Sequence, residues 1–195
     1  MHFSQELADR FMRYVRIDTE ADPNASSFPS SEKQKDLGRL LTQELIELGA
    51  SDVEMDEWGY VFATIPSNSP NQNLPTICFC SHMDTAPDCS GKDVKPILHR
   101  AWNGSPITLP DDTTQVITVE NQPYLSRKIG QDVITASGLT LLGADDKAGV
   151  TIIMELAKHL LTHSEIPHGK IRILFTPDEE VGRGVEHLDM NKLGA

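Results

Sequence analysis

The chain has 195 residues, of which 38% are hydrophobic and 24% charged, a composition typical of a globular protein with room for one α/β domain. Its 17 basic and 29 acidic residues give a formal net charge of −12, which argues against nucleic acid or an anionic membrane as a partner and favours a cation. The first residues, to Ile17, have neither the apolar core of a signal peptide nor the length of a membrane span, so we expect a cytoplasmic protein.

The cysteines predict no disulfide framework. There are three, Cys78, Cys80 and Cys89, and the first two alternate along one apolar strand, where a bridge between them is geometrically unfavourable. We expect reduced, partly buried thiols.

Two amphipathic helices and a β-hairpin are predicted in the first third of the chain. Apolar residues recur at helical spacing in two segments, and a loop rich in proline and serine separates them. Two short β-favouring runs around a Trp-Gly turn then indicate a hairpin. The expected elements are a helix to about Ile17, a loop at 19–30, a helix from about Ser31 to Gly49, and strands at 53–56 and 60–65.

Two interior strands, a long excursion and a buried helix are predicted in the rest of the chain. The strands are continuous apolar runs of the kind that is buried on both faces of a sheet. The excursion is rich in proline and has no helical period. The buried helix should connect the strand at 133–135 to the second interior strand in a right-handed βαβ unit. The expected elements are strands at 75–80 and 170–175, an excursion at about 86–130 with short strands near 115–119 and 133–135, and a largely buried helix after Gly143.

Side chains with metal-ligand chemistry follow both interior strands and open the helix between them. Because strand ends of an open α/β sheet meet at one edge, we expect five carboxylates and one imidazole to cluster there. Such a cluster needs a cation, and this donor set suits zinc, manganese or cobalt better than calcium. The residues are His82, Asp84, Asp145, Asp146, Glu179 and Glu180.

Each segment taken alone also has a structural interpretation. A single His-x-Asp after a strand is most often structural, and acidic residues at a helix start satisfy free N–H groups there. Neither interpretation explains the adjacent Glu179 and Glu180, which repel one another unless a cation or a proton separates them. His159 and His163 could also share a metal, but a helix C-terminus favours histidines for its dipole alone.

Three segments resemble, in the same order, the metal-site motifs of the M20 family of dizinc aminoacylases and peptidases. They are SHMDTAPD at 81–88, LLGADDKAG at 141–149 and TPDEEVG at 176–182. The stretch 84–96 and the excursion after it are similar to the family's tripeptide aminopeptidases from bacterial cytoplasm. The resemblance implies a three-layer α/β/α catalytic domain with a mixed, mostly parallel sheet.

The resemblance also implies residue roles. His82 would be a ligand of one zinc ion, Glu180 a ligand of the other, and Asp145 a bridge between them. Asp84 would orient His82, Glu179 would be the general base, and the peptide between the two aspartates at 145 and 146 would be cis. The implied activity is release of the N-terminal residue of tripeptides. Another M20 activity, on acylamino acids or dipeptides, remains open, as does a non-catalytic structural fragment.

In the family, the catalytic domain continues beyond the position of Ala195 and supplies an acidic ligand and a histidine, with a lid domain between them. The resemblance therefore implies that 1–195 is the N-terminal portion of the catalytic domain, without the lid and the remainder. We accordingly expect weak zinc binding by this chain, no appreciable turnover, and self-association through an exposed sheet edge.

Overall fold

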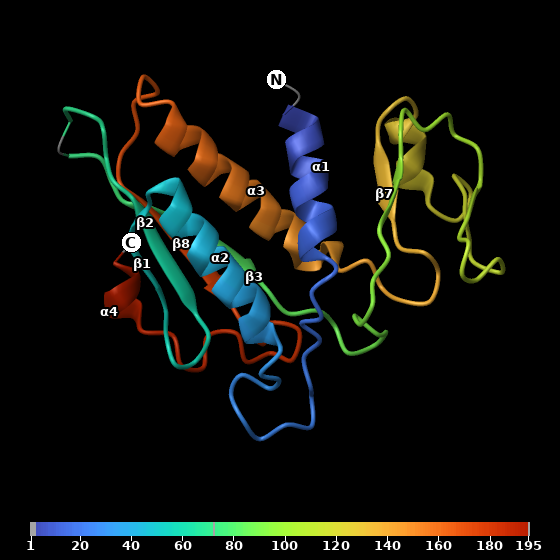
Figure 1. The fold of residues 1–195 in the computed structure, drawn as a ribbon, viewed down its shortest axis with the longest axis horizontal. Helices are drawn as coiled ribbons and strands as arrows, with labels where there is room; N and C mark the ends of the chain where they lie inside the picture. The colour runs from blue at the N-terminus through green and yellow to red at the C-terminus, as the bar shows by residue number, and fades with distance from the viewer. Residues whose placement is uncertain (1–2, 72, 195) are drawn as a thin grey trace.

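The computed structural model describes residues 3–71 and 73–194. Its main body is a four-stranded sheet with two long helices packed on one face and a third helix packed against one of them (Figure 1). The strand order is β1-β2-β8-β3. The elements of this body are α1 Phe3–Tyr14, α2 Gln34–Leu48, β1 Ser51–Met55, β2 Val61–Ile65, β3 Ile77–His82, α3 Ala144–Thr162, β8 Ile171–Thr176 and α4 Met190–Leu193.

The α/β class and the mixed sheet are confirmed, but the sheet is not mostly parallel. The tight turn between β1 and β2 makes that pair antiparallel, and β2 pairs antiparallel with β8. Only β3 runs parallel to β8 among the described strands. The predicted helices and the hairpin are present, and Gly49 ends α2 with a left-handed φ of 85°.

Alternation along the strands divides the core between the two faces of the sheet. Ala63 and Ile173 point to the face covered by α2 and α3, whereas Phe62 and Leu174 point to the opposite face. There they meet Leu193 of the short helix α4. In the described part of the chain, the second helical layer of the expected three-layer fold is therefore limited to α4.

The prediction that 75–80 is buried on both faces is wrong. Ile77 and Phe79 of β3 are 53% and 37% exposed, because β3 lies at the edge of the sheet with β8 as its one described neighbour. The largely buried helix predicted after Gly143 is present as α3, although its Ile152 is 60% exposed. Burial of a strand depends on its neighbours, which its own sequence does not contain.

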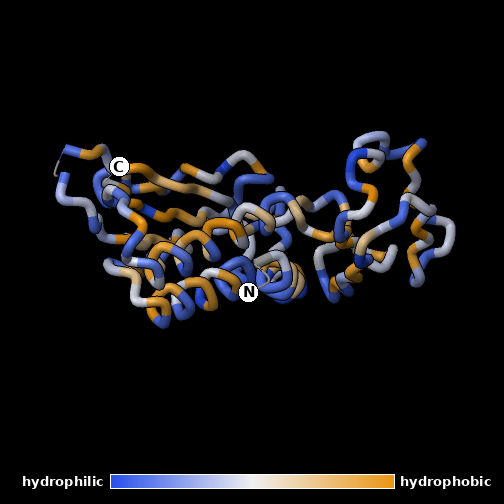
Figure 2. The backbone as a smooth tube through the Cα atoms, turned by 90° about the horizontal axis from the view of Figure 1, so that it is seen from above, coloured by the Kyte–Doolittle hydropathy of each residue, from blue (hydrophilic) through white to orange (hydrophobic). Residues whose placement is uncertain are grey.

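The excursion forms a separate lobe beside the helices (Figure 2). Its small core contains Trp102, Ile107 and Leu109. The strands expected near 115–119 and 133–135 are present, whereas its other strands and the 3-10 helix were not predicted. The elements are β4 Ile97–His99, β5 Ile107–Thr108, β6 Val116–Ile117, η1 Pro123–Lys128 and β7 Val133–Thr135.

The predicted βαβ unit is wrong in its first strand. β7 pairs with β4 in a two-stranded sheet of the lobe, while the parallel partner of β8 is β3. The lobe and α3 thus both lie in the connection from β3 to β8. Among the described residues, no helix combines the length and the apolar character needed to cross a membrane.

Candidate metal centre

The parallel pairing of β3 with β8 brings the predicted site residues to one edge of the sheet. His82, the last residue of β3, is paired with Thr176, the last residue of β8. The residues that follow β3 and the residues that follow β8 therefore lie next to one another. The start of α3, which packs against β3, brings Asp145 to the same edge.

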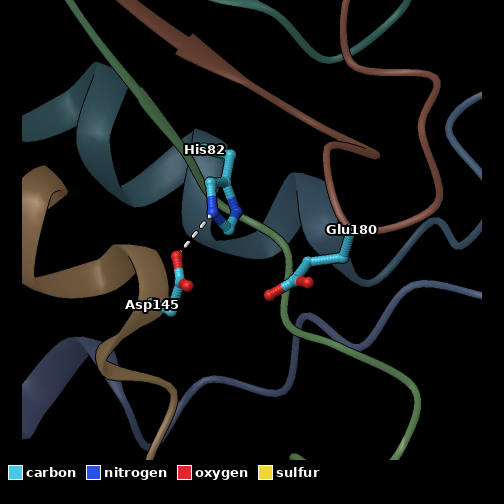
Figure 3. Close-up of side chains that lie close together, drawn as sticks. All are labelled: His82, Asp145 and Glu180. Atoms are coloured by element: carbon cyan, nitrogen blue, oxygen red, sulfur yellow. Dashed lines mark hydrogen bonds and ion pairs between the residues drawn. The ribbon is translucent and has the colours of Figure 1, made fainter.

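Three side chains at this edge could hold a metal ion. His82, Asp145 and Glu180 each offer one ligand atom, and these atoms all lie within 4.8 Å of one another. His82 Nε2 is 3.0 Å from Asp145 Oδ1, and Figure 3 shows the carboxylates of Asp145 and Glu180 on either side of the imidazole. One nitrogen and carboxylate oxygens at this spacing are a donor set that fits zinc.

Glu179 and Asp84 complete the group of residues that the sequence predicts for this site. Glu179 Oε2 lies 3.8 Å from His82 Nε2, and its side chain is 60% exposed. Asp84 is fully buried, and its two carboxylate oxygens accept the backbone N–H groups of Glu179 and Glu180, each at 3.0 Å. Its Oδ1 is also 3.4 Å from His82 Nδ1. Asp84 therefore contacts both the imidazole and the acidic loop.

The crowding of charge shifts the pKa of two of these groups. Burial disfavours the charged form of His82, but hydrogen bonds and charge from Asp84 and Asp145 outweigh it and raise the pKa of the imidazole to about 9. Burial raises the pKa of Glu180, and the neighbouring carboxylates add to this shift while His82 opposes it. Without a cation, the site thus retains protons more strongly than isolated side chains do.

Asp146 was expected among the clustered carboxylates, but its carboxylate has other partners. It accepts the Ser81 hydroxyl at 2.5 Å and the backbone N–H of Gly149 at 3.2 Å. The peptide between Asp145 and Asp146 is cis, as the family resemblance implies. The role of Ser81 was missed, although its position directly before His82 on the strand was a signal that could have found it.

Two further features concern α3: a buried lysine at its start beside the site, and a histidine pair at its far end. Lys147 is buried and donates to the Ile17 carbonyl at 2.7 Å, and burial lowers its pKa to about 8. His159 and His163, the alternative metal pair, lie with ring centroids 4.3 Å apart at the end of α3. His163 Nδ1 is 2.9 Å from the His159 carbonyl oxygen, which agrees with a structural role at the helix end.

Comparison with known proteins gives the same family as the motifs. The family model described as "Peptidase family M20/M25/M40" matches residues 108–192. Peptidase T of Bacillus cereus strain ATCC 14579 is 47% identical over all 195 residues, which correspond to 47% of its length. The chain thus spans about half the length of the curated relatives that it matches.

Solved structures with related sequences have the same fold. The aminopeptidase PepT from Bacillus cereus ATCC 10987 aligns with a TM-score of 0.65 and 26% identity, over 96% of this chain and 40% of that one. A tripeptidase from Staphylococcus aureus aligns with a TM-score of 0.64, also at 26% identity and with the same coverage. The resemblance to the M20 peptidases is therefore confirmed, and the chain is homologous over its whole length to about half of a Peptidase T chain.

Proposed function

We propose that this chain is the metal-binding part of a dizinc aminopeptidase that releases the N-terminal residue of tripeptides. The observation that carries the proposal is the convergence of His82, Asp145 and Glu180, with Glu179 beside them. The similarity to proteins named Peptidase T and to a solved tripeptidase supports the substrate class.

In this proposal, His82 and Glu180 would each hold a zinc ion, and Asp145 would serve as a ligand of both. Asp84 orients the imidazole of His82, because a ligating histidine needs its second ring nitrogen fixed. Bound zinc would supply Lewis-acid activation of water and of the scissile carbonyl.

Glu179 is the proposed general base. Its carboxylate is largely exposed beside His82, so it can reach a water molecule and a bound peptide. Glu179 takes a proton from the attacking water, whose oxygen bonds to the carbonyl carbon. When the C–N bond breaks, Glu179 returns the proton to the leaving amine.

We further propose that 1–195 is the N-terminal portion of the catalytic domain, with the lobe at about 86–130 as an excursion from it. The curated relatives are about twice as long, which supports ligands from a further segment. The chain alone should then bind zinc weakly and turn over no tripeptide at an appreciable rate. Its free cysteines, two of them exposed, support a reducing compartment such as the cytoplasm.

The test joins metal binding to activity. Zinc binding to the 195-residue chain is measured by calorimetry for wild type, His82→Ala and Glu179→Gln, with Glu47→Gln on α2 as the matched exposed control. For activity, the chain replaces the corresponding segment of Bacillus cereus Peptidase T, and tripeptide hydrolysis is followed.

We expect His82→Ala to abolish zinc binding, and Glu179→Gln to retain zinc but lower kcat of the chimera roughly 10²–10⁴-fold. The control should resemble wild type in both assays. A chimera that folds and binds zinc but cleaves no tripeptide would refute the proposed substrate class. Unchanged zinc binding in His82→Ala would refute the proposed metal site.

A further inference from the structure

Asp178, directly before the acidic pair, is a buried carboxylate in an unusual backbone conformation. It is fully buried, and its φ of 57° lies in the left-handed region that residues other than glycine rarely adopt. Such a conformation persists only where the surroundings hold it. The residues that contact Asp178 therefore also affect the positions of Glu179 and Glu180, which follow it directly.

Asp178 is held by the start of α2 and the residues just before it. Its carboxylate accepts from the Ser30 backbone N–H at 2.6 Å, from the Ser30 hydroxyl at 2.5 Å and from the Gln34 side-chain amide at 2.6 Å. Gln34 is fully buried, and its amide oxygen also accepts the backbone N–H of Asp178 at 3.0 Å. Gln34 thus contacts both the side chain and the main chain of Asp178.

Three consecutive backbone N–H groups of the acidic loop are bound by side chains from other segments. Gln34 accepts from Asp178, and Asp84 accepts from Glu179 and Glu180. The loop is therefore fixed from two directions, by the residues that follow β3 and by the first residue of α2. Asp84 belongs to the metal centre itself, whereas Gln34 and Ser30 contact none of its candidate ligands directly.

We propose that Gln34 and Ser30, acting through Asp178, are positioning residues that set the metal affinity of the centre. By fixing the backbone at 178–180, they hold the carboxylate of Glu180 toward His82 and that of Glu179 beside it. Loss of the Gln34 amide leaves the buried backbone N–H of Asp178 without a partner and leaves its carboxylate with the two Ser30 donors alone. The loop can then leave its left-handed conformation. The part of this proposal that concerns zinc rests on the proposed function.

The test compares Gln34→Ala with Gln43→Ala, since Gln43 lies on the same helix and its exposed amide binds only Glu47 in the described contacts. Ser30→Ala is the milder variant, because it removes the hydroxyl and keeps the backbone N–H that binds Asp178. Two quantities are measured on folded protein: the zinc dissociation constant by calorimetry, and the hydrogen-exchange rates of the amides of Glu179 and Glu180 without metal.

We expect Gln34→Ala to weaken zinc binding about 10–100-fold and to speed exchange at both amides. Ser30→Ala should shift both quantities in the same direction by a smaller factor, and Gln43→Ala should match wild type. Folded Gln34 and Ser30 variants with wild-type affinity and exchange would overturn the proposal. If the wild-type chain bound no zinc, the proposed metal affinity of this chain would fail, and hydrogen exchange alone would decide whether Gln34 positions the loop.

Discussion

Gly149 lies in the first turns of α3, and its missing side chain leaves room for Asp146 to fold back onto the helix. A Cβ at this position would lie 2.4 Å from Asp146 Oδ1 and 2.7 Å from the Ser81 hydroxyl oxygen. The Ser81 hydroxyl donates to the other carboxylate oxygen, Asp146 Oδ2, and Oδ1 accepts the backbone N–H of Gly149, so neither group can move aside without losing a hydrogen bond. The glycine is therefore part of the arrangement that fixes Asp146, the residue that directly follows Asp145.

We predict that Gly149→Ala destabilises the chain by about 1–3 kcal/mol, because the added methyl group overpacks this contact. It should also weaken zinc binding, because Asp146 follows the proposed ligand Asp145 in the chain and a shift of Asp146 would move the Asp145 carboxylate. Denaturant unfolding and calorimetry measure the two effects.

Gly38→Ala in α2 is the matched control. Its Cβ would meet the sulfur of Met55 at 2.8 Å, the far part of a flexible side chain that can move. Alanine also favours a helix over glycine. Equal destabilisation in the two variants would show that the contact with Asp146 has no special importance.

The site residues that could be predicted from the sequence are those whose chemical type and place at the end of a strand or the start of a helix already indicate a metal site. His82, Asp84, Asp145, Glu179 and Glu180 are polar side chains at the ends of apolar segments, and the structure brings them together. The contacts of Asp178 could not be predicted, because Gln34 is 144 residues away in the sequence. A left-handed φ at an aspartate likewise has no local signature.

Among the secondary-structure elements, β3 is an edge strand that exposes apolar side chains to solvent. It contains apolar side chains that are partly exposed, and one of its edges has no partner among the described strands. An unpaired, apolar edge is a template for pairing with another chain. We therefore expect a second copy of this chain to associate along β3.

The predicted outcome is concentration-dependent association of the wild-type chain, reduced by Ile77→Lys because a charge at the edge opposes pairing. Sedimentation at several protein concentrations measures it. Ile46→Lys on α2 is the matched control, since Ile46 and Ile77 are both 53% exposed. Equal reduction by both variants would indicate general surface hydrophobicity rather than the strand edge.

Helices and hairpins were predictable because their signals are local, whereas strand neighbours were not. The periodicity of α2 and the turn between β1 and β2 are contained in short segments of sequence. The pairing of β7 with β4, rather than a place beside β8, depends on residues about 35 positions away. The exposure of β3 depends in the same way on a strand that its own sequence does not contain.

At the scale of the whole molecule, the metal centre joins three segments that are distant in sequence, so binding should stabilise the folded chain. The proton on His82 competes with this binding. The pKa of His82 is raised from 6.5 to about 9 in the folded chain, so its charged form stabilises the metal-free fold below pH 6.5. That contribution is lost as the pH rises from 6.5 through 9.

Zinc binds only the neutral imidazole, so below pH 9 it must displace this proton. We predict that the apparent zinc affinity rises roughly tenfold per pH unit between pH 6 and 8, and that zinc raises Tm more at pH 8 than at pH 6. Thermal unfolding with and without zinc at each pH measures the shift, with magnesium as the control ion. His82→Ala should lose the zinc shift at both pH values. A zinc-dependent rise in Tm that is equal at pH 6 and pH 8 would contradict His82 as a ligand, because a metal bound elsewhere would not compete with its proton.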